Sequence, residues 1–256
     1  MNNSGKSMGM VVVMASLLFS STDVAFAEGV DIPLTESWKM TQGGKLYDNW
    51  AKVVYFDTKN LSTHPSYPKE GKKSGADTWR CKECHGWDYK GADGAYSKGS
   101  HYTGIKGVRD LVGKTPETIA KIVRNDLHGY SAAMIPDQAL KELALFVARG
   151  QIDMDQYIDR ATKKVHGNPQ RGASFYQNIC ANCHGYDGRQ INFKAAPKED
   201  FIGTVASANP WETLHKIRNG QPGVPMISLA MLSIQDQLDI LAYCQTLPEK
   251  SDSVKK

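Results

Sequence analysis

No stretch of this chain is apolar for long enough to cross a membrane as a helix. Such a helix needs about 20 consecutive apolar residues, and the longest apolar run covers only residues 10–19. An excess of one charge is also missing, because 31 Lys and Arg face 27 Asp and Glu and no long basic run occurs. We therefore expect no stable membrane insertion and no nucleic-acid partner.

The short apolar run has the layout of a secretory leader. Lys6 precedes it as a basic region, and residues 25–27 follow it as the small-residue cleavage pattern A-F-A. An uncleaved anchor is the alternative, but the run is too short to span a bilayer. We expect residues 1–27 to be a signal peptide that is cleaved after Ala27, which places the mature chain outside the cytoplasmic membrane.

Cysteine is scarce as well, and four of the five cysteines fall in two copies of one motif. Residues 81–85 read C-K-E-C-H and residues 180–184 read C-A-N-C-H. The pattern C-x-x-C-H attaches a c-type haem, since two thiols three positions apart can bond the two vinyl groups of one porphyrin and the adjacent histidine can bind the iron. A zinc site is the weaker alternative. The predicted attachment residues are Cys81, Cys84, Cys180 and Cys183, the predicted proximal ligands are His85 and His184, and the predicted cofactors are two covalently attached haem c groups.

The two motifs lie in halves that repeat each other. Residues 117–122 read E-T-I-A-K-I, and residues 212–217 read E-T-L-H-K-I. Each half has a helix, the C-x-x-C-H motif, a loop, a short helix that begins with proline, a methionine and a terminal helix. This order predicts an all-α fold of two domains, 28–160 and 161–256, each wrapped around one haem.

Helices are predicted from apolar periodicity and from capping residues. Thr115 with Pro116 begins one short helix, and Asn168 with Pro169 begins the helix that leads into Cys180. The other predicted helices cover about residues 41–54, 137–149, 209–219 and 233–246, with loops at 86–113 and 185–207.

An iron that carries electrons without binding substrate needs a second axial ligand. Met134 and Met226 fall at the same point of the repeat, just before the terminal helix, so each is the predicted second ligand of its haem. His101 and His128 are the alternatives to Met134 and would lower the reduction potential. Met231, the rival of Met226, is expected to pack against the terminal helix.

The remaining histidines and the fifth cysteine are not predicted to bind haem. Cys244 falls on the apolar stripe of the last helix, with a reactive thiol or an iron ligand as the alternative. His215 is expected to be exposed, because Ala120 replaces it in the other repeat. His64 and His166 have no predicted role. Three aromatic residues that follow the motifs are expected to pack near the porphyrin edges: Trp87, Tyr89 and Tyr186.

The two C-x-x-C-H motifs, each followed by a methionine before the terminal helix, resemble the class I c-type cytochromes. The doubled arrangement is similar to cytochrome c4, a periplasmic di-haem carrier. In that family the first and last helices cross at a glycine and aromatic pair, which implies Gly172 with Phe175 and Gly44 with Tyr47. The second of these pairs lies far from Cys81, so the first domain carries an insertion at about residues 52–80.

The resemblance also implies how the proximal histidine is oriented. In the family, a backbone carbonyl near a downstream proline fixes the ring N–H. Pro197 is placed to serve His184, whereas no proline lies between His85 and Thr115.

We predict a periplasmic di-haem cytochrome c that transfers single electrons between redox proteins, more a carrier than an enzyme. One alternative is a haem enzyme such as a di-haem thiosulfate dehydrogenase or peroxidase, which would depend on the insertion, on His101 or His128, or on Cys244. Another is the cytochrome subunit of a dehydrogenase or oxidase complex, with the insertion as a docking surface.

Overall fold

The computed structural model describes residues 35–250, and this part of the chain is helical, with two isolated β-bridges and no strand. The all-α prediction is confirmed for these residues. The predicted signal peptide lies outside them. Among the described helices, none combines the length and apolarity that a membrane crossing requires.

The first half begins with α1 (Glu36–Val53), whose first turn is capped by the Thr35 side chain. The motif forms α2 (Cys81–His85), and α3 (Pro116–Arg124) begins as predicted, with Thr115 as its cap. The last helix, α4 (Asp137–Leu145), continues into a π-helical turn at Phe146–Gly150. Short 3₁₀ turns lie at Gly75–Trp79, Arg109–Leu111 and Met154–Gln156.

The second half repeats this order. The Asn168 side chain caps α5 (Pro169–Phe175), which continues through a π-helical turn, Tyr176–Cys180, into α6 (Ala181–His184). The Asn209 side chain caps α8 (Pro210–Asn219), and α9 (Ile234–Cys244) ends the half. The prediction of an uninterrupted loop at 185–207 was wrong, because α7 (Ile202–Ala208) begins within it.

In each half the first and last helices cross at a glycine. A Cβ atom on Gly172 would lie 1.9 Å from the carbonyl oxygen of Asp239 in α9, so only glycine allows α5 to approach this closely. A Cβ on Gly43 would lie 2.1 Å from the carbonyl oxygen of Glu142 in α4. The prediction of Gly44 for this crossing was wrong by one residue, since Gly44 faces Asn219 of α8 instead.

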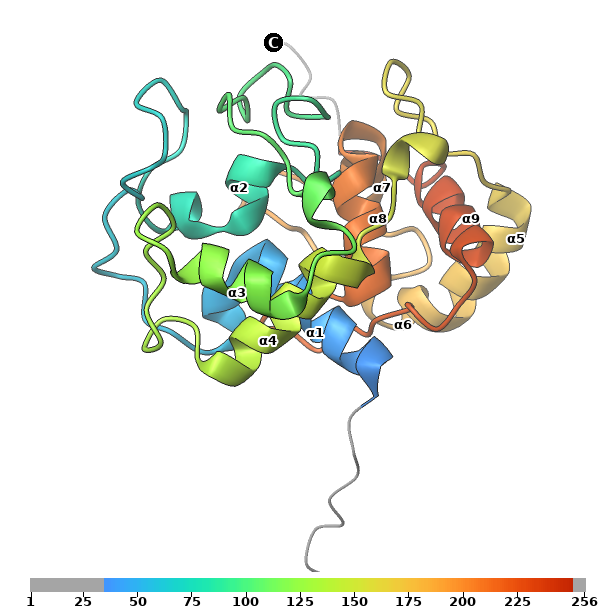
Figure 1. Cartoon of the computed structure of the whole chain (residues 1–256). Coiled ribbons are helices and arrows are strands. Elements are labelled where there is room, and N and C mark those ends of the chain that lie inside the picture. Colours follow the sequence, from blue (N-terminus) through green and yellow to red (C-terminus); the bar gives the residue numbers. More distant parts are fainter. Residues whose placement is uncertain (1–34, 251–256) are drawn as a thin grey trace, which may run out of the picture. The chain divides into compact units, whose positions relative to one another are not determined.

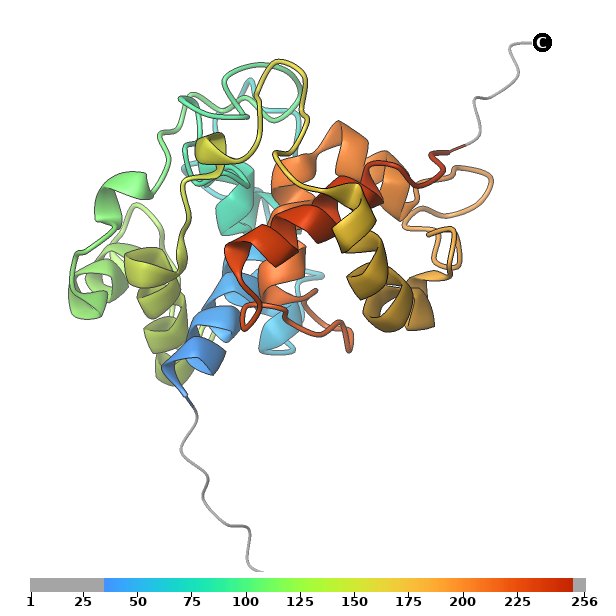
Figure 2. The ribbon, with the colours of Figure 1, turned by 90° about the vertical axis from the view of Figure 1, so that its right-hand side faces the viewer.

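The two halves meet where α1 lies against α8. Figure 1 shows α3 and α4 on one side of α1, with α5 and α9 together beyond α8, and Figure 2 shows α9 crossing α5. Buried apolar side chains of both halves form one continuous core. The first C-x-x-C-H turn packs against α1, the helix that also contacts α8 of the second half.

Candidate functional site

Each C-x-x-C-H motif forms one helical turn that ends at a glycine. In α2, Cys81 and Cys84 are three residues apart and so lie on the same face of the helix. Gly86 ends this turn at φ 77° and ψ 158°, and Gly185 ends the second turn at φ 78° and ψ 159°. These left-handed values favour glycine, and their agreement shows that the two motifs have the same local backbone.

A buried tyrosine from the first helix of each half fastens the end of each turn. The hydroxyl of Tyr47 donates a hydrogen bond to the carbonyl of Gly86 at 2.7 Å. Tyr176 donates in the same way to the carbonyl of Gly185 at 3.1 Å. The aromatic partner of the crossing glycine in the second half is therefore Tyr176, and the prediction of Phe175 was wrong by one residue.

Among the described residues, none of the motif cysteines forms a disulfide. Burial raises the pKa of Cys81 and of Cys84 to about 12, and burial together with Cys183 raises that of Cys180 to about 11. Two cysteines on one helical face, followed directly by a histidine, are the residues that covalent haem c requires from each motif.

His85, the predicted proximal ligand of the first half, is fixed by a backbone carbonyl. The Nδ1–H of His85 donates to the carbonyl of Lys106 at 2.8 Å, which leaves Nε2 as the nitrogen with a lone pair. Burial lowers the pKa of His85 to about 4, and the nearby His128 lowers it as well. The ring is therefore neutral near pH 7, as a metal-binding imidazole must be.

A second imidazole faces His85. The ring centroid of His128 lies 6.3 Å from that of His85, and the two ring planes are inclined by 30°. The Nδ1–H of His128 donates to the side-chain oxygen of Asn125 at 3.1 Å. Burial lowers the pKa of His128, and so does His64.

His184, the predicted proximal ligand of the second half, has a different environment. Its Nδ1 is buried and has no hydrogen-bond partner among residues 35–250. Its ring lies edge-on to Phe193, with 6.2 Å between the centroids. The expected bond from His184 to a carbonyl near Pro197 is absent from the hydrogen bonds of the described residues, so that expectation was wrong for this structure.

The sulfur residues named from the sequence lie in unlike places. Met134 packs, partly buried, against the hydrophobic core, and Met226 is also partly buried. Met231 is 83% exposed, so the expectation that it packs against the terminal helix was wrong. Cys244 is buried as predicted, and burial raises the pKa of its thiol well above the usual range.

His101 is engaged with the first motif turn rather than with the His85 ring. Its Nδ1 lies 3.2 Å from the carboxylate of Glu83, and its ring stacks on Tyr96 at 4.8 Å between centroids. Burial opposes ionisation of Glu83, but His101 and Lys82 hold its pKa at about 2. His101 therefore acts here as the partner of a buried carboxylate.

His215 is buried between the two halves, so the prediction that it is exposed was wrong. Its Nε2–H donates to the carbonyl of Gly44 at 2.9 Å, and its Nδ1 accepts from the Tyr89 hydroxyl at 2.8 Å. The ring also lies 5.2 Å from that of Trp87. Sequence comparison with Ala120 missed this role because it depends on contacts between the halves. Tyr186, by contrast, is exposed.

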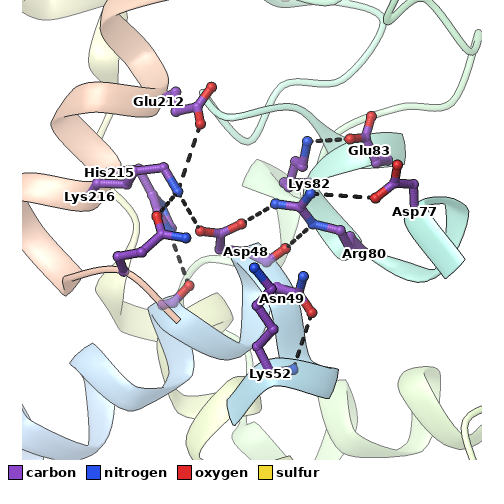
Figure 3. Close-up of polar contacts among 12 residues, drawn as sticks. Asp48, Asn49, Lys52, Asp77, Arg80, Lys82, Glu83, Glu212, His215 and Lys216 are labelled. Atoms are coloured by element: carbon purple, nitrogen blue, oxygen red, sulfur yellow. Dashed lines mark hydrogen bonds and ion pairs between the residues drawn. The ribbon is translucent and has the colours of Figure 1, made fainter. Parts of the chain in front are cut away.

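A buried carboxylate links the halves beside His215 (Figure 3). Asp48 of α1 accepts from Lys216 of α8 at 2.7 Å and forms a close ion pair with Arg80, the residue before Cys81. Burial opposes ionisation of Asp48, but Lys216 and Arg80 hold its pKa at about 2. This network ties the start of α2 to the second half.

The alternative of a zinc site gains no support from the described residues. Among residues 35–250, no group of three or more His, Cys, Asp and Glu side chains is placed to hold one metal ion. The motif residues fit covalent haem better, since that cofactor needs only two thiols and one imidazole from each motif.

Comparison with known proteins bears on the second half. No curated protein matches the chain. Residues 167–243 match the family model described as cytochrome C oxidase, cbb3-type, subunit III. This segment contains Cys180, Cys183, His184 and Met226. Residues 167–243 are therefore a cytochrome c domain, the kind of domain that carries covalently bound haem c.

Proposed function

We propose that the protein is an exported di-haem cytochrome c, similar in arrangement to cytochrome c4, that passes single electrons between redox proteins. The observation that carries this proposal is the repeated turn. The backbone at Gly86 has the same φ and ψ as the backbone at Gly185 in the matched cytochrome c domain, and a tyrosine fastens each turn.

The residues of each site have separate tasks. Bound haem c supplies an iron that changes by one electron, at a potential set by its ligands and surroundings. Cys81 and Cys84 would hold one group, and Cys180 and Cys183 the other. His85 would bind iron in a fixed orientation, because the Lys106 carbonyl holds its Nδ1–H.

The layer between the halves would keep the two groups at a constant separation. Tyr47, Tyr89, Phe146 and His215 are almost fully buried and contact one another across this layer. Dense packing of this kind excludes water and resists deformation. Met226 remains the proposed second ligand of the second haem. For the first haem, the second ligand is either Met134 or His128.

A second candidate role is the cytochrome subunit of an oxidase complex. The observation that favours it is the family description, which names subunit III of an oxidase. In either role we propose that the mature protein begins at Glu28, after cleavage behind Ala27, and acts in the periplasm. Purification from the native host distinguishes the two roles, since a subunit co-purifies with its oxidase and a free carrier does not.

Mass spectrometry of the denatured, purified protein tests the di-haem proposal. We expect the mass of residues 28–256 plus two haem increments of about 600 daltons each. The double variant Cys81→Ala/Cys84→Ala should lose one increment, and Cys180→Ala/Cys183→Ala should lose the other. A wild-type mass with one increment or none would overturn the proposal. Turnover of thiosulfate or peroxide would favour an enzyme instead.

A further inference from the structure

The spacing of two histidine rings in the first half matches that of two imidazoles that share one metal ion. Two imidazoles bonded at about 2 Å to one metal from opposite sides, through nitrogens about 1 Å from the ring centre, would have centroids about 6 Å apart. The His85 and His128 centroids are 6.3 Å apart, with ring planes 30° from parallel. Rings in direct stacking contact lie closer than this in the same protein, as at Tyr96 and His101, 4.8 Å apart.

The hydrogen bonds of both rings favour the same tautomer. His85 uses Nδ1 to donate to Lys106, and His128 uses Nδ1 to donate to Asn125. The lone pair of each ring is then on Nε2, the arrangement found when the second nitrogen of a ligating histidine is held by an oxygen acceptor. The two imidazoles thus lie next to each other, with His85 directly after Cys84, and the His128 ring is held further by the backbone carbonyl of Ile122.

The insertion holds the backbone of His128. His64 donates through Nε2–H to the carbonyl of His128 at 2.9 Å, and the Ser66 hydroxyl donates to the carbonyl of Leu127 at 2.6 Å. Because His64 accepts from the Ser66 N–H at Nδ1, its tautomer is fixed as well. Two residues of the insertion therefore hydrogen-bond to consecutive carbonyls of the loop that carries His128.

His64 is itself held firmly enough to act as such a support. It is buried, its backbone N–H donates to the Thr78 hydroxyl at 2.8 Å, and its ring lies 4.3 Å from that of Trp79. Tyr130, two residues after His128, donates its hydroxyl hydrogen to the carbonyl of Trp79. The segment between α1 and α2 thus contacts the chain on both sides of His128.

The other candidate ligands lack such an arrangement. His101 is paired with Glu83 and stacked on Tyr96. Met134 packs against the core, and its backbone N–H bonds back to Ser131. His101 is therefore paired with Glu83, whereas the His128 ring lies beside the His85 ring.

We propose that His128 is the second axial ligand of the haem attached through Cys81 and Cys84, and that His64 and Ser66 position it. This inference rests on the proposed di-haem function. Bis-histidine ligation of the first haem, with a methionine on the second, gives the first haem the lower reduction potential. The protein then has one haem suited to take electrons from a donor and one suited to pass them on.

Spectroscopy of the oxidised, haem-loaded protein tests the ligand. The wild type should show the charge-transfer band of one methionine-ligated haem, not two. Met134→Leu should leave this band and both reduction potentials unchanged, while His128→Ala should convert half of the haem to the high-spin form and His128→Met should raise the lower potential. His166→Ala, at an exposed histidine, is the control.

The positioning role of His64 is tested separately, by the reduction potential and spin state of the first haem. His64→Leu should shift the lower potential and make part of the first haem high-spin, and His64→Gln, which keeps an N–H donor, should restore the wild-type spectrum. Loss of half the methionine band in Met134→Leu, with an unchanged spectrum in His128→Ala, would overturn the inference. Because mass spectrometry counts haems independently, that result would leave the di-haem proposal standing, whereas a single haem increment would remove both.

Discussion

The two C-x-x-C-H turns have nearly identical backbones but different surroundings. The residue two positions after the histidine is Trp87 in the first turn, 1% exposed, and Tyr186 in the second, 76% exposed. His85 has its Nδ1 held by a carbonyl, whereas Nδ1 of His184 has no hydrogen-bond partner within the part of the chain that the structure describes. The halves therefore share the backbone of the turn, while each half surrounds its histidine differently.

Removal of the Asp48 carboxylate, which joins the halves, should lower the free energy of unfolding the most. Asp48→Ala would leave Arg80 and Lys216 without their shared, fully buried partner. Loss of one member of a buried ion pair destabilises a protein by about 3–5 kcal/mol, and we expect a loss near 3 kcal/mol in urea unfolding. Asp77→Ala is the control, because the Asp77 side chain is 59% exposed and should contribute below about 1 kcal/mol. Equal effects of the two substitutions would contradict the role of Asp48.

Substitution of the crossing glycines compares the halves directly. In Gly43→Ala and Gly172→Ala the new methyl would meet a backbone oxygen, so each should lower the free energy of unfolding by about 1–3 kcal/mol. Gly44→Ala should also destabilise the protein, because its methyl would meet the buried side chain of Asn219. We expect a smaller loss than at Gly43, where the methyl would lie 2.1 Å from a backbone oxygen. A larger loss at Gly44 than at Gly43 would show that α1 meets α4 in a different register.

The pH dependence of stability tests the contribution of the Asp48 carboxylate. The pKa of Asp48 is lowered from 3.8 to about 2 in the folded protein. Its stabilising contribution is therefore complete above pH 4 and is lost as the pH falls through about 2, a change of about 2 kcal/mol. Asp48→Asn cannot titrate, so its unfolding free energy should vary less with pH in this window. Parallel curves for the two proteins would contradict the lowered pKa.

The tyrosines that fasten the turns should have the smallest effects. Tyr47→Phe removes a hydrogen bond to the buried carbonyl of Gly86, at a cost of about 1 kcal/mol. Tyr176→Phe should cost less, because its bond to Gly185 is longer and only partly buried. Urea unfolding of the haem-loaded variants measures both losses. A larger loss for Tyr176→Phe than for Tyr47→Phe would contradict this order.

Local chemistry made much of the fold predictable. Proline after Thr115, Asn168 and Asn209 correctly marked helix starts, because proline fits the first helical position and the preceding side chain caps it. The doubled C-x-x-C-H motif likewise identified the cytochrome c domain at 167–243.

Contacts between segments far apart in the chain could not be predicted from the sequence. The burial of His215 depends on α1, and the grip on His128 depends on His64, sixty-four positions earlier in the chain. The choice between Gly43 and Gly44 depends on which face of α1 meets α4 and which meets α8. Periodicity shows that a helix has a buried face, but α1 is covered on two sides.

Spectroelectrochemical titration of the mature protein tests the central claim most directly, namely that one chain holds two haems in unlike environments. We predict two one-electron steps of equal amplitude at separate potentials, with the methionine charge-transfer band following only the higher step. A single step with the amplitude of one haem, or two steps that both carry the methionine band, would contradict the account.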